Sequence, residues 1–199
     1  MRQDVSKLYK QLSQLDPDKD RFMAMQERRK ELLEPLMTEL NPKAYEVQLI
    51  ELGVELQDIN SAMFDVMYED LRSRGAKPKR SEAATMNGYG LKSVSYSKQV
   101  TEMILRKEDK YVYAQAILNM TLSAARIHSK LYEKDEALAL KHLENSWKEY
   151  DWLSKFMKEY MREQKIERPE DLPPAMGEPY RMMLEMVELL PLKIAKLNA

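Results

Sequence analysis

The clearest helical pattern in the chain lies in residues 110–163, KYVYAQAILNMTLSAARIHSKLYEKDEALALKHLENSWKEYDWLSKFMKEYMRE. Apolar residues recur in its first part every three or four positions, at Tyr113, Ile117, Met120, Ala124, Ile127 and Leu131. This is the period of an α-helix with one buried face. From about residue 135 the pattern continues with Leu140, Leu143, Trp147, Tyr150, Phe156 (or Met157) and Tyr160. The short connection at residues 133–135 predicts two antiparallel helices.

This helical hairpin is similar to one unit of a tetratricopeptide array. Ala124 or Ala125 would be the small residue of its first helix, and Ala139, Leu143 and Ser146 would give a small-large-small pattern on its second. No second copy follows at the repeat length of about 34 residues. The pattern alone therefore indicates a helical hairpin protein, of the kind that binds other proteins.

The rest of the chain shows the same helical period. Further helices are predicted over residues 1–15, 18–40, 43–73, 92–107 and 180–197. Pro35 should kink or end the second of these, because proline lacks a backbone donor and clashes inside a helix. Gly53 lies within the third, where the close approach of a neighbouring helix would explain it. Residues 74–91 contain Gly75, Pro78, Gly88 and Gly90 and are predicted to form one long loop.

These elements predict an all-α protein of about seven helices, stacked as antiparallel hairpins in a short right-handed solenoid. We expect a single helical domain over residues 1–199. Its parts would be an N-terminal helix (1–17), a long hairpin (18–73), the loop (74–91), and tetratricopeptide-like helices with a closing helix (92–197). Only five glycines occur in 199 residues, too few for the many turns of a β-rich fold.

Composition excludes several classes of function. Lys and Arg number 32 against 33 Asp and Glu, which argues against nucleic acid as a partner. The chain has no cysteine, and no apolar run approaches the length of a membrane span. His128 and His142 stand fourteen positions apart, at no metal-binding spacing, so they are interpreted as structural. We therefore expect no enzyme activity, no metal and no cofactor.

Local motifs resemble a known family. Arg28-Arg29-Lys30 is followed by Leu33-Glu34-Pro35-Leu36 and then by Glu39-Leu40-Asn41-Pro42, with Tyr45 close behind. Near the other end stands Glu185-Met186-Val187-Glu188-Leu189-Leu190-Pro191, followed by Lys193. Both stretches resemble the C-terminal region of the kinesin-binding protein (KIF-binding protein) family, and the resemblance spans about residues 19–197. Family members are much longer, so this chain resembles a C-terminal lobe.

The resemblance implies a tetratricopeptide-like scaffold that binds kinesin motor domains and keeps them off microtubules. It also implies a cytoplasmic, cytoskeleton-associated protein, of a family linked to axon growth and organelle transport. The alternative is a self-associating helical scaffold, or a general protein-interaction domain that binds no kinesin. The sequence leaves the oligomeric state open.

Two segments are predicted to contact a partner. The turn that contains Glu39 and Asn41 presents a carboxylate and an amide beside a helix start, and it coincides with the best family match. The predicted loop carries the cations Lys77, Lys79 and Arg80. Because the microtubule-binding side of a motor is basic, the acidic turn should attract it more strongly than the basic loop would.

Overall fold

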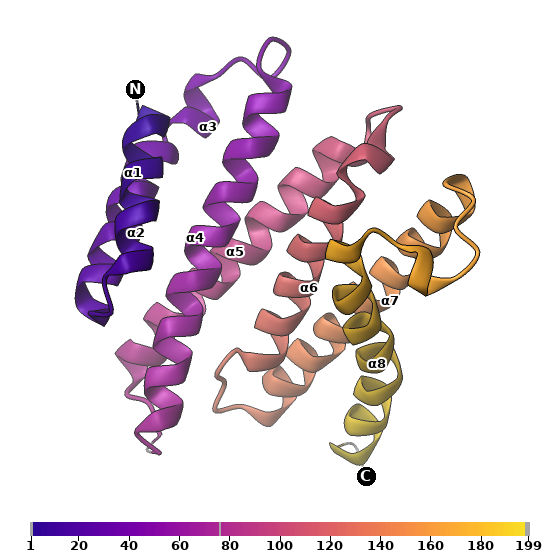
Figure 1. The fold of residues 1–199 in the computed structure, drawn as a ribbon. Helices are drawn as coiled ribbons and strands as arrows, with labels where there is room; N and C mark the ends of the chain where they lie inside the picture. Colours follow the sequence, from indigo (N-terminus) through magenta and orange to yellow (C-terminus); the bar gives the residue numbers. More distant parts are fainter. Residues whose placement is uncertain (1, 76, 198–199) are drawn as a thin grey trace. The chain divides into compact units, whose positions relative to one another are not determined.

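The computed structural model describes residues 2–75 and 77–197, so the expected helix start at Met1, the loop residue Ala76 and the last two residues lie outside it. Within the described residues all regular structure is helical (Figure 1). Seven long α-helices are present: α1 (Arg2–Leu15), α2 (Lys19–Leu33), α4 (Glu46–Ser73), α5 (Arg80–Leu105), α6 (Ala114–Lys130), α7 (Glu136–Glu163) and α8 (Pro174–Leu197). One four-residue helix, α3 (Leu36–Glu39), and two 3₁₀ turns, η1 (Lys110–Tyr113) and η2 (Pro169–Asp171), complete the described chain. The all-α prediction is confirmed.

The chain divides into two compact units, residues 1–103 and 104–199. Each is described by itself below. The expected single domain, and the stacking of hairpins as a solenoid, stay predictions.

The first unit is built around α4. The helical period predicts one apolar stripe on this helix, from Tyr45 to Leu71. The stripe is buried over most of its length, and Leu52, Leu56, Ile59 and Met63 are fully inaccessible. Leu33 of α2 joins them, with Met23, Leu36, Met37, Tyr89 and Tyr96 packed around the cluster. Burial of this many large side chains is the main term that favours folding of the unit. Tyr45, at the start of the predicted stripe, is instead exposed.

The boundaries of α2 follow from its caps. Asp18 caps the first turn, because its carboxylate accepts the backbone N–H of Arg21 at 2.9 Å. At the other end the helix stops at Leu33, two residues before Pro35, and α3 forms a separate turn. Of the two effects predicted for Pro35, a kink or an end of the helix, the structure confirms the second.

The predicted loop at residues 74–91 is wrong over most of its length. Only residues 74–79 connect the helices, and α5 begins at Arg80. Ala83, Met86, Val94 and Val100 are buried along α5. Each glycine in a helix costs only about 1 kcal/mol relative to alanine, so Gly88 and Gly90 do not outweigh that burial. The separate helix predicted over 92–107 is the second half of α5.

Gly53 confirms the prediction of a close helix approach. The Cγ2 methyl of Val100 on α5 occupies the space that a Cβ at position 53 would need. At Gly88, by contrast, an added Cβ would meet no atom within 4 Å. The glycine in α4 therefore permits close packing of α4 and α5.

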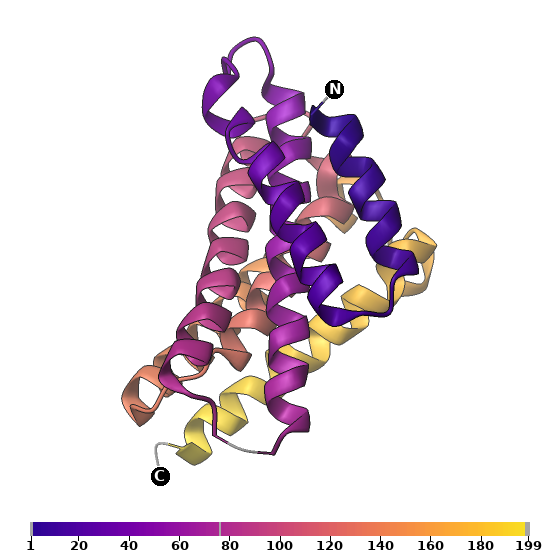
Figure 2. The same ribbon diagram turned by 90° about the vertical axis from the view of Figure 1, so that its left-hand side faces the viewer.

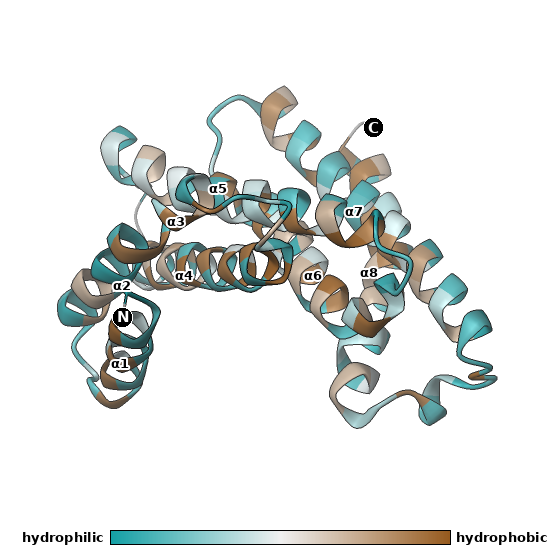
Figure 3. Cartoon of the chain, turned by 90° about the horizontal axis from the view of Figure 1, so that it is seen from above, coloured by the Kyte–Doolittle hydropathy of each residue, from teal (hydrophilic) through white to brown (hydrophobic). Residues whose placement is uncertain are grey.

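Helix α1 differs from the expected arrangement of its side chains. Its two buried residues are Ser6 and Ser13. Val5, Leu8, Leu12 and Leu15 stand at helical spacing in the sequence, but all four are exposed. Figure 2 shows α1 and α2 running side by side, and Figure 3 shows α1 at the edge of its unit.

The second unit contains the predicted hairpin. Asp135 caps α7 by accepting the N–H groups of Ala137 and Leu138. Ser146 Oγ donates a 2.7 Å hydrogen bond to the carbonyl oxygen of Ala125, which brings the small faces of α6 and α7 together. At the far end of the hairpin the Tyr111 ring lies 5.8 Å from the ring of Phe156. The predicted antiparallel pair is confirmed.

Helix α8 packs against both helices of this hairpin through Met176, Tyr180, Met183 and Leu190. It starts at Pro174. The four prolines within residues 168–179 instead predict a linker or extended turn there, with the helix starting at 180. Proline is tolerated in a first helical turn because the N–H it lacks would have no helical partner there. The burial of Met176 and Tyr180 then extends the helix toward its N-terminus.

Candidate functional site

The predicted acidic turn follows α3. The Asn41 side-chain oxygen accepts the backbone N–H of Lys43 at 3.0 Å, and its carbonyl oxygen accepts the N–H of Tyr45 at 3.0 Å. Asn41 therefore shapes the turn, and the first turn of α4 starts only after it, at Glu46. Tyr45 and Val47 are each 46% exposed beside the turn. The turn between α3 and α4 thus presents a small exposed surface that has a polar part and an apolar part.

The carboxylate of Glu39 already has a partner. Nη1 of Arg2 lies 3.0 Å from Glu39 Oε2, and the two side chains are 48% and 53% exposed. An ion pair this exposed contributes at most about 1 kcal/mol. A competing cation can therefore displace Arg2 at little cost, but the turn is less acidic than its sequence indicates.

The predicted basic cluster lies at the end of the connection between α4 and α5 and at the first residue of α5. Lys77, Lys79 and Arg80 are exposed there. Glu82 organises the connection, because its carboxylate accepts the backbone N–H of Lys79 at 2.8 Å and pairs with Arg74 Nη1 at 2.9 Å. These two donors hold the pKa of the Glu82 carboxyl below its ordinary value.

The two predicted segments do not form one site. They lie at opposite ends of α4, which has 28 residues (Figure 1). At a rise of about 1.5 Å per residue the helix separates them by roughly 40 Å. A small contact surface on a partner could therefore touch one of the two segments but not both.

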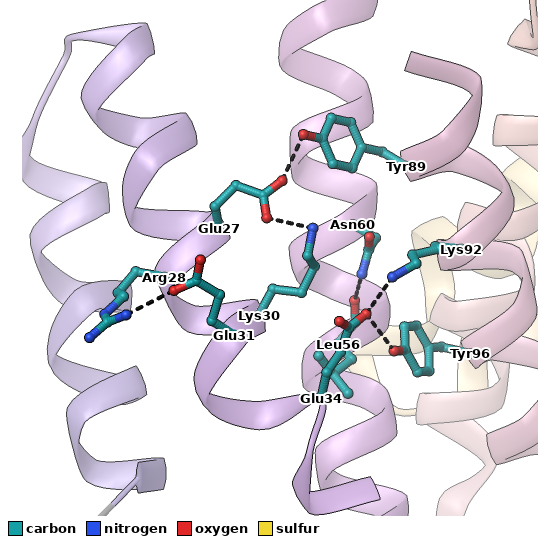
Figure 4. A network of polar contacts seen from close by, with 10 residues as sticks. All are labelled: Glu27, Arg28, Lys30, Glu31, Glu34, Leu56, Asn60, Tyr89, Lys92 and Tyr96. Atoms are coloured by element: carbon teal, nitrogen blue, oxygen red, sulfur yellow. Dashed lines mark hydrogen bonds and ion pairs between the residues drawn. The ribbon is translucent and has the colours of Figure 1, made fainter. Parts of the chain in front are cut away.

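A network of polar contacts between α2 and α5 was not predicted. Figure 4 shows the Glu34 carboxylate accepting from Lys92 Nζ at 2.6 Å and from the Tyr96 hydroxyl at 3.0 Å. Glu34 belongs to the Leu-Glu-Pro-Leu motif that carries the family resemblance. In this chain Glu34 of the motif joins α2 to α5, while Leu33, the first residue of the motif, fills the core.

A second part of the network lies two turns earlier on α2. The Tyr89 hydroxyl donates a 2.7 Å hydrogen bond to Glu27, and Lys30 pairs with the same carboxylate while lying 5.3 Å from the centre of the Tyr89 ring. Partial burial and the neighbouring carboxylate raise the pKa of Tyr89 to about 12. For Glu27 burial alone would raise the pKa, but the donors Lys30 and Tyr89 outweigh it and hold the pKa below its ordinary value.

The second unit has a shallow apolar hollow between α7 and α8. Its volume is about 440 Å³, and its lining residues are Glu144, Trp147, Lys148, Pro191, Ile194 and Ala195. Trp147 was expected to lie in the middle of a buried stripe, but one side of it borders this hollow and the residue is only partly buried. The hollow has no group suited to chemistry beyond two surface charges.

The two histidines lie together in the second unit. The ring of His128 on α6 stacks on that of His142 on α7, with centroids 6.1 Å apart, and His142 Nε2 lies 3.6 Å from Glu133. Among the described residues no group of three or more His, Cys, Asp or Glu side chains is placed to hold a metal ion. Nor does any helix in the described ranges combine the length and apolar character that crossing a membrane requires.

The fold and these surfaces define an all-α protein whose distinctive features are helix contacts and exposed turns. The family model described as "KIF-1 binding protein C terminal" matches residues 1–197. The chain therefore belongs to the KIF-binding protein family, through its C-terminal region.

Relatives in this family are KIF-binding proteins of vertebrates. The chain is 27% identical over 203 residues to that of Danio rerio and 26% identical over 203 residues to that of Gallus gallus, in each case with 99% of this chain covered. It is 26% identical over 160 residues to that of Xenopus tropicalis, with 76% of this chain covered. The aligned region makes up 31%, 32% and 25% of these proteins, so the chain spans about a third of their length or less. No solved structure matches the chain.

Proposed function

We propose that this protein is a non-catalytic binding module that contacts kinesin motor domains and hinders their engagement with microtubules. The observation that carries the proposal is the family match over residues 1–197, together with relatives whose name states that they bind a KIF protein. The module would act in the cytoplasm, where motors meet microtubules. Its partner is a motor domain, and it needs no cofactor.

The turn at Glu39 and Asn41 is the proposed contact. Its position between α3 and α4 is fixed by the hydrogen bonds of Asn41, and exposed Tyr45 and Val47 add apolar area beside it. Motors bind acidic tubulin through a basic side, so a carboxylate at this turn offers charge complementarity. Lys77, Lys79 and Arg80, at the other end of α4, are proposed to contribute less.

Two measurements test this function. The chain is immobilised, and a panel of kinesin motor domains is passed over it at two salt concentrations. A motor that binds is then cosedimented with microtubules with and without an excess of the chain. We expect saturable binding that weakens with salt, and a smaller fraction of motor in the microtubule pellet. Absence of binding to every motor in the panel would contradict the proposal.

Binding without a loss of microtubule engagement would separate the two parts of the proposal. The contact with the motor would then stand, and the inhibitory part would be withdrawn.

A further inference from the structure

Helix α1, which lies alongside α2 (Figure 2), is attached to its unit by polar side chains. Its buried residues are Ser6 and Ser13, at 0% and 5% exposure. Gln3 and Tyr9, on the same side of the helix, are partly buried. The aliphatic residues described in the helix are all exposed, namely Val5, Leu8, Leu12 and Leu15. Buried apolar area is the main term that keeps a helix docked, so α1 is weakly held.

The buried ion pair beneath α1 does not depend on this helix. Arg29 of α2 is 4% exposed and pairs with Glu55 of α4 at 2.8 Å. Its Nη1 also donates to the side-chain oxygen of Gln26, again on α2, at 2.6 Å. Helix α1 adds hydrogen bonds through two serines. Ser6 Oγ donates to Glu55 at 3.0 Å and accepts from Arg29 Nε at 3.4 Å. Ser13 Oγ accepts from Gln26 at 3.1 Å.

Opening of α1 therefore leaves no charge without a partner. Water can replace the hydroxyls of Ser6 and Ser13, because the surface beneath them becomes accessible when the helix leaves. Arg29 and Glu55 keep each other as partners, and Gln26 stays beside them on α2. An unpaired buried charge is what would make such an opening costly, and none is created here.

Arg2, in the first turn of α1, ties this helix to the proposed motor contact. Its Nη1 lies 3.0 Å from Oε2 of Glu39. While α1 is docked, the guanidinium holds the carboxylate that the proposed function offers to the basic side of a motor. Both side chains are about half exposed, so a cation of the motor can compete for Glu39 but has to displace Arg2.

We propose that α1 is a detachable strap that regulates the contact at Glu39 and Asn41. With α1 docked, Arg2 neutralises the carboxylate of Glu39. With α1 open, the carboxylate is free to pair with a cationic side chain of the motor. The motor then binds the open state more tightly, so its apparent affinity rises with the fraction of molecules in which α1 is open. This regulation rests on the proposed motor contact, whereas the opening of α1 does not.

Hydrogen exchange of the whole chain, followed by mass spectrometry of its peptic peptides, tests the opening without a motor. After correction for intrinsic rates, the amides of α1 should exchange together and at least about 100-fold faster than those in the middle of α4. Helix α2 should exchange as slowly as α4, because α1 opens alone while its unit stays folded. Exchange of α1 as slow as that of α4, or one common rate for α1 and α2, would overturn the proposal.

Ser6→Leu should shift α1 toward the open state, because a larger apolar side chain at this fully buried position meets the ion pair of Arg29 with Glu55. The amides of α1 should then exchange about tenfold faster, with those of α4 unchanged. A kinesin motor should bind about two- to threefold more tightly, a gain that the weakness of the exposed ion pair limits. Gln11→Leu is the matched control: it places the same side chain at an exposed position of α1 and should change neither measurement.

Arg2→Gln tests whether the strap acts through Glu39. It should raise the motor affinity about as much as Ser6→Leu does, and the two substitutions together should raise it no further, because both free the same carboxylate. Additive gains would show that α1 affects the motor by another route and would overturn the proposal. Equal affinities of the Ser6→Leu variant and the unaltered chain would do the same.

Failure of the strap and failure of the proposed function give different results. Absence of binding to every motor would contradict the proposed function and remove the contact that the strap regulates. The exchange rates would still decide whether α1 opens, because no motor is present in that measurement.

Discussion

At the scale of single residues, Glu34 shows how a motif can identify a family through its role in folding. Its carboxylate holds Lys92 and Tyr96 of α5, and the residue before it fills the core. The exposed residues of the same stretch have other roles. Asn41 shapes the turn through its hydrogen bonds, and Glu39 gives the turn a negative charge. A resemblance to the family therefore does not by itself say which residues touch a partner.

Replacing Glu34 by Ala should lower the free energy of unfolding by about 1–2 kcal/mol, because two donors lose a shared acceptor that is partly accessible to solvent. Urea denaturation followed by circular dichroism measures this. The matched control is Glu31→Ala, which removes only the exposed pair with Arg28 and should cost no more than about 0.5 kcal/mol. Equal effects of the two substitutions would contradict the role assigned to Glu34.

Ionisation of Tyr89 should make the free energy of unfolding depend on pH in the alkaline range. Its pKa is about 12 in the folded chain and near 10 in the unfolded one, so the folded state keeps the proton longer. The stabilisation is fully present below about pH 10 and is lost as the pH rises toward 12. Burial and the carboxylate of Glu34 also raise the pKa of Tyr96, which acts in the same direction.

Titration of tyrosine absorbance with pH measures this, and Tyr89 and Tyr96 should be among those of the 11 tyrosines that ionise above the ordinary pH range of a phenol. In Tyr89→Phe one of these late-ionising phenols should disappear. A titration in which all tyrosines ionise near pH 10 while the chain is still folded would contradict the network in Figure 4.

At the scale of helices, periodicity predicted most elements because burial imposes it. The stripes of α4, α6 and α7 are buried largely as their spacing indicated, and the caps at Asp18 and Asp135 set helix starts. The sequence does not predict the start of α5, because its glycines indicate a loop, whereas burial of Ala83 and Met86 stabilises a helix there. The orientation of α1 could not be predicted, because it depends on Arg29 and Glu55, which lie on other helices.

Gly53→Ala should destabilise the first unit by about 1–3 kcal/mol, because the new methyl group meets Val100 in a packed contact. Thermal unfolding measures the effect. Gly88→Ala is the matched control, because nothing lies near that position, and it should raise stability by about 0.5–1 kcal/mol. Val100→Ala in the Gly53→Ala background should recover part of the loss, and failure of this rescue would place the strain elsewhere.

At the scale of the whole molecule, the sequence predicted the all-α class and the family, because both depend on patterns that run along the chain. It predicted much less of the candidate site. The ion pair between Arg2 and Glu39 joins residues 37 positions apart, and only the packing of the first unit brings them together. The distance that separates the two charged segments also depends on α4 being one uninterrupted helix.

This arrangement gives a prediction for motor binding. Glu39→Lys with Asn41→Ala should weaken binding of a kinesin motor by about two- to tenfold at low salt, mainly through the association rate, because an exposed charge is reversed and the turn loses its side-chain hydrogen bond. The melting temperature should change little. Neutralising Lys77, Lys79 and Arg80 should leave binding unchanged or slightly stronger.

Arg2→Gln is the informative control, because it frees the Glu39 carboxylate without removing it, and should therefore strengthen binding slightly. Surface plasmon resonance at two salt concentrations compares the three variants with the unaltered chain. Normal binding by the turn variant together with loss of binding by the variant at residues 77–80 would assign the contact to the opposite end of α4. Weaker binding by Arg2→Gln would show that the ion pair itself, and not the free carboxylate, is what the motor recognises.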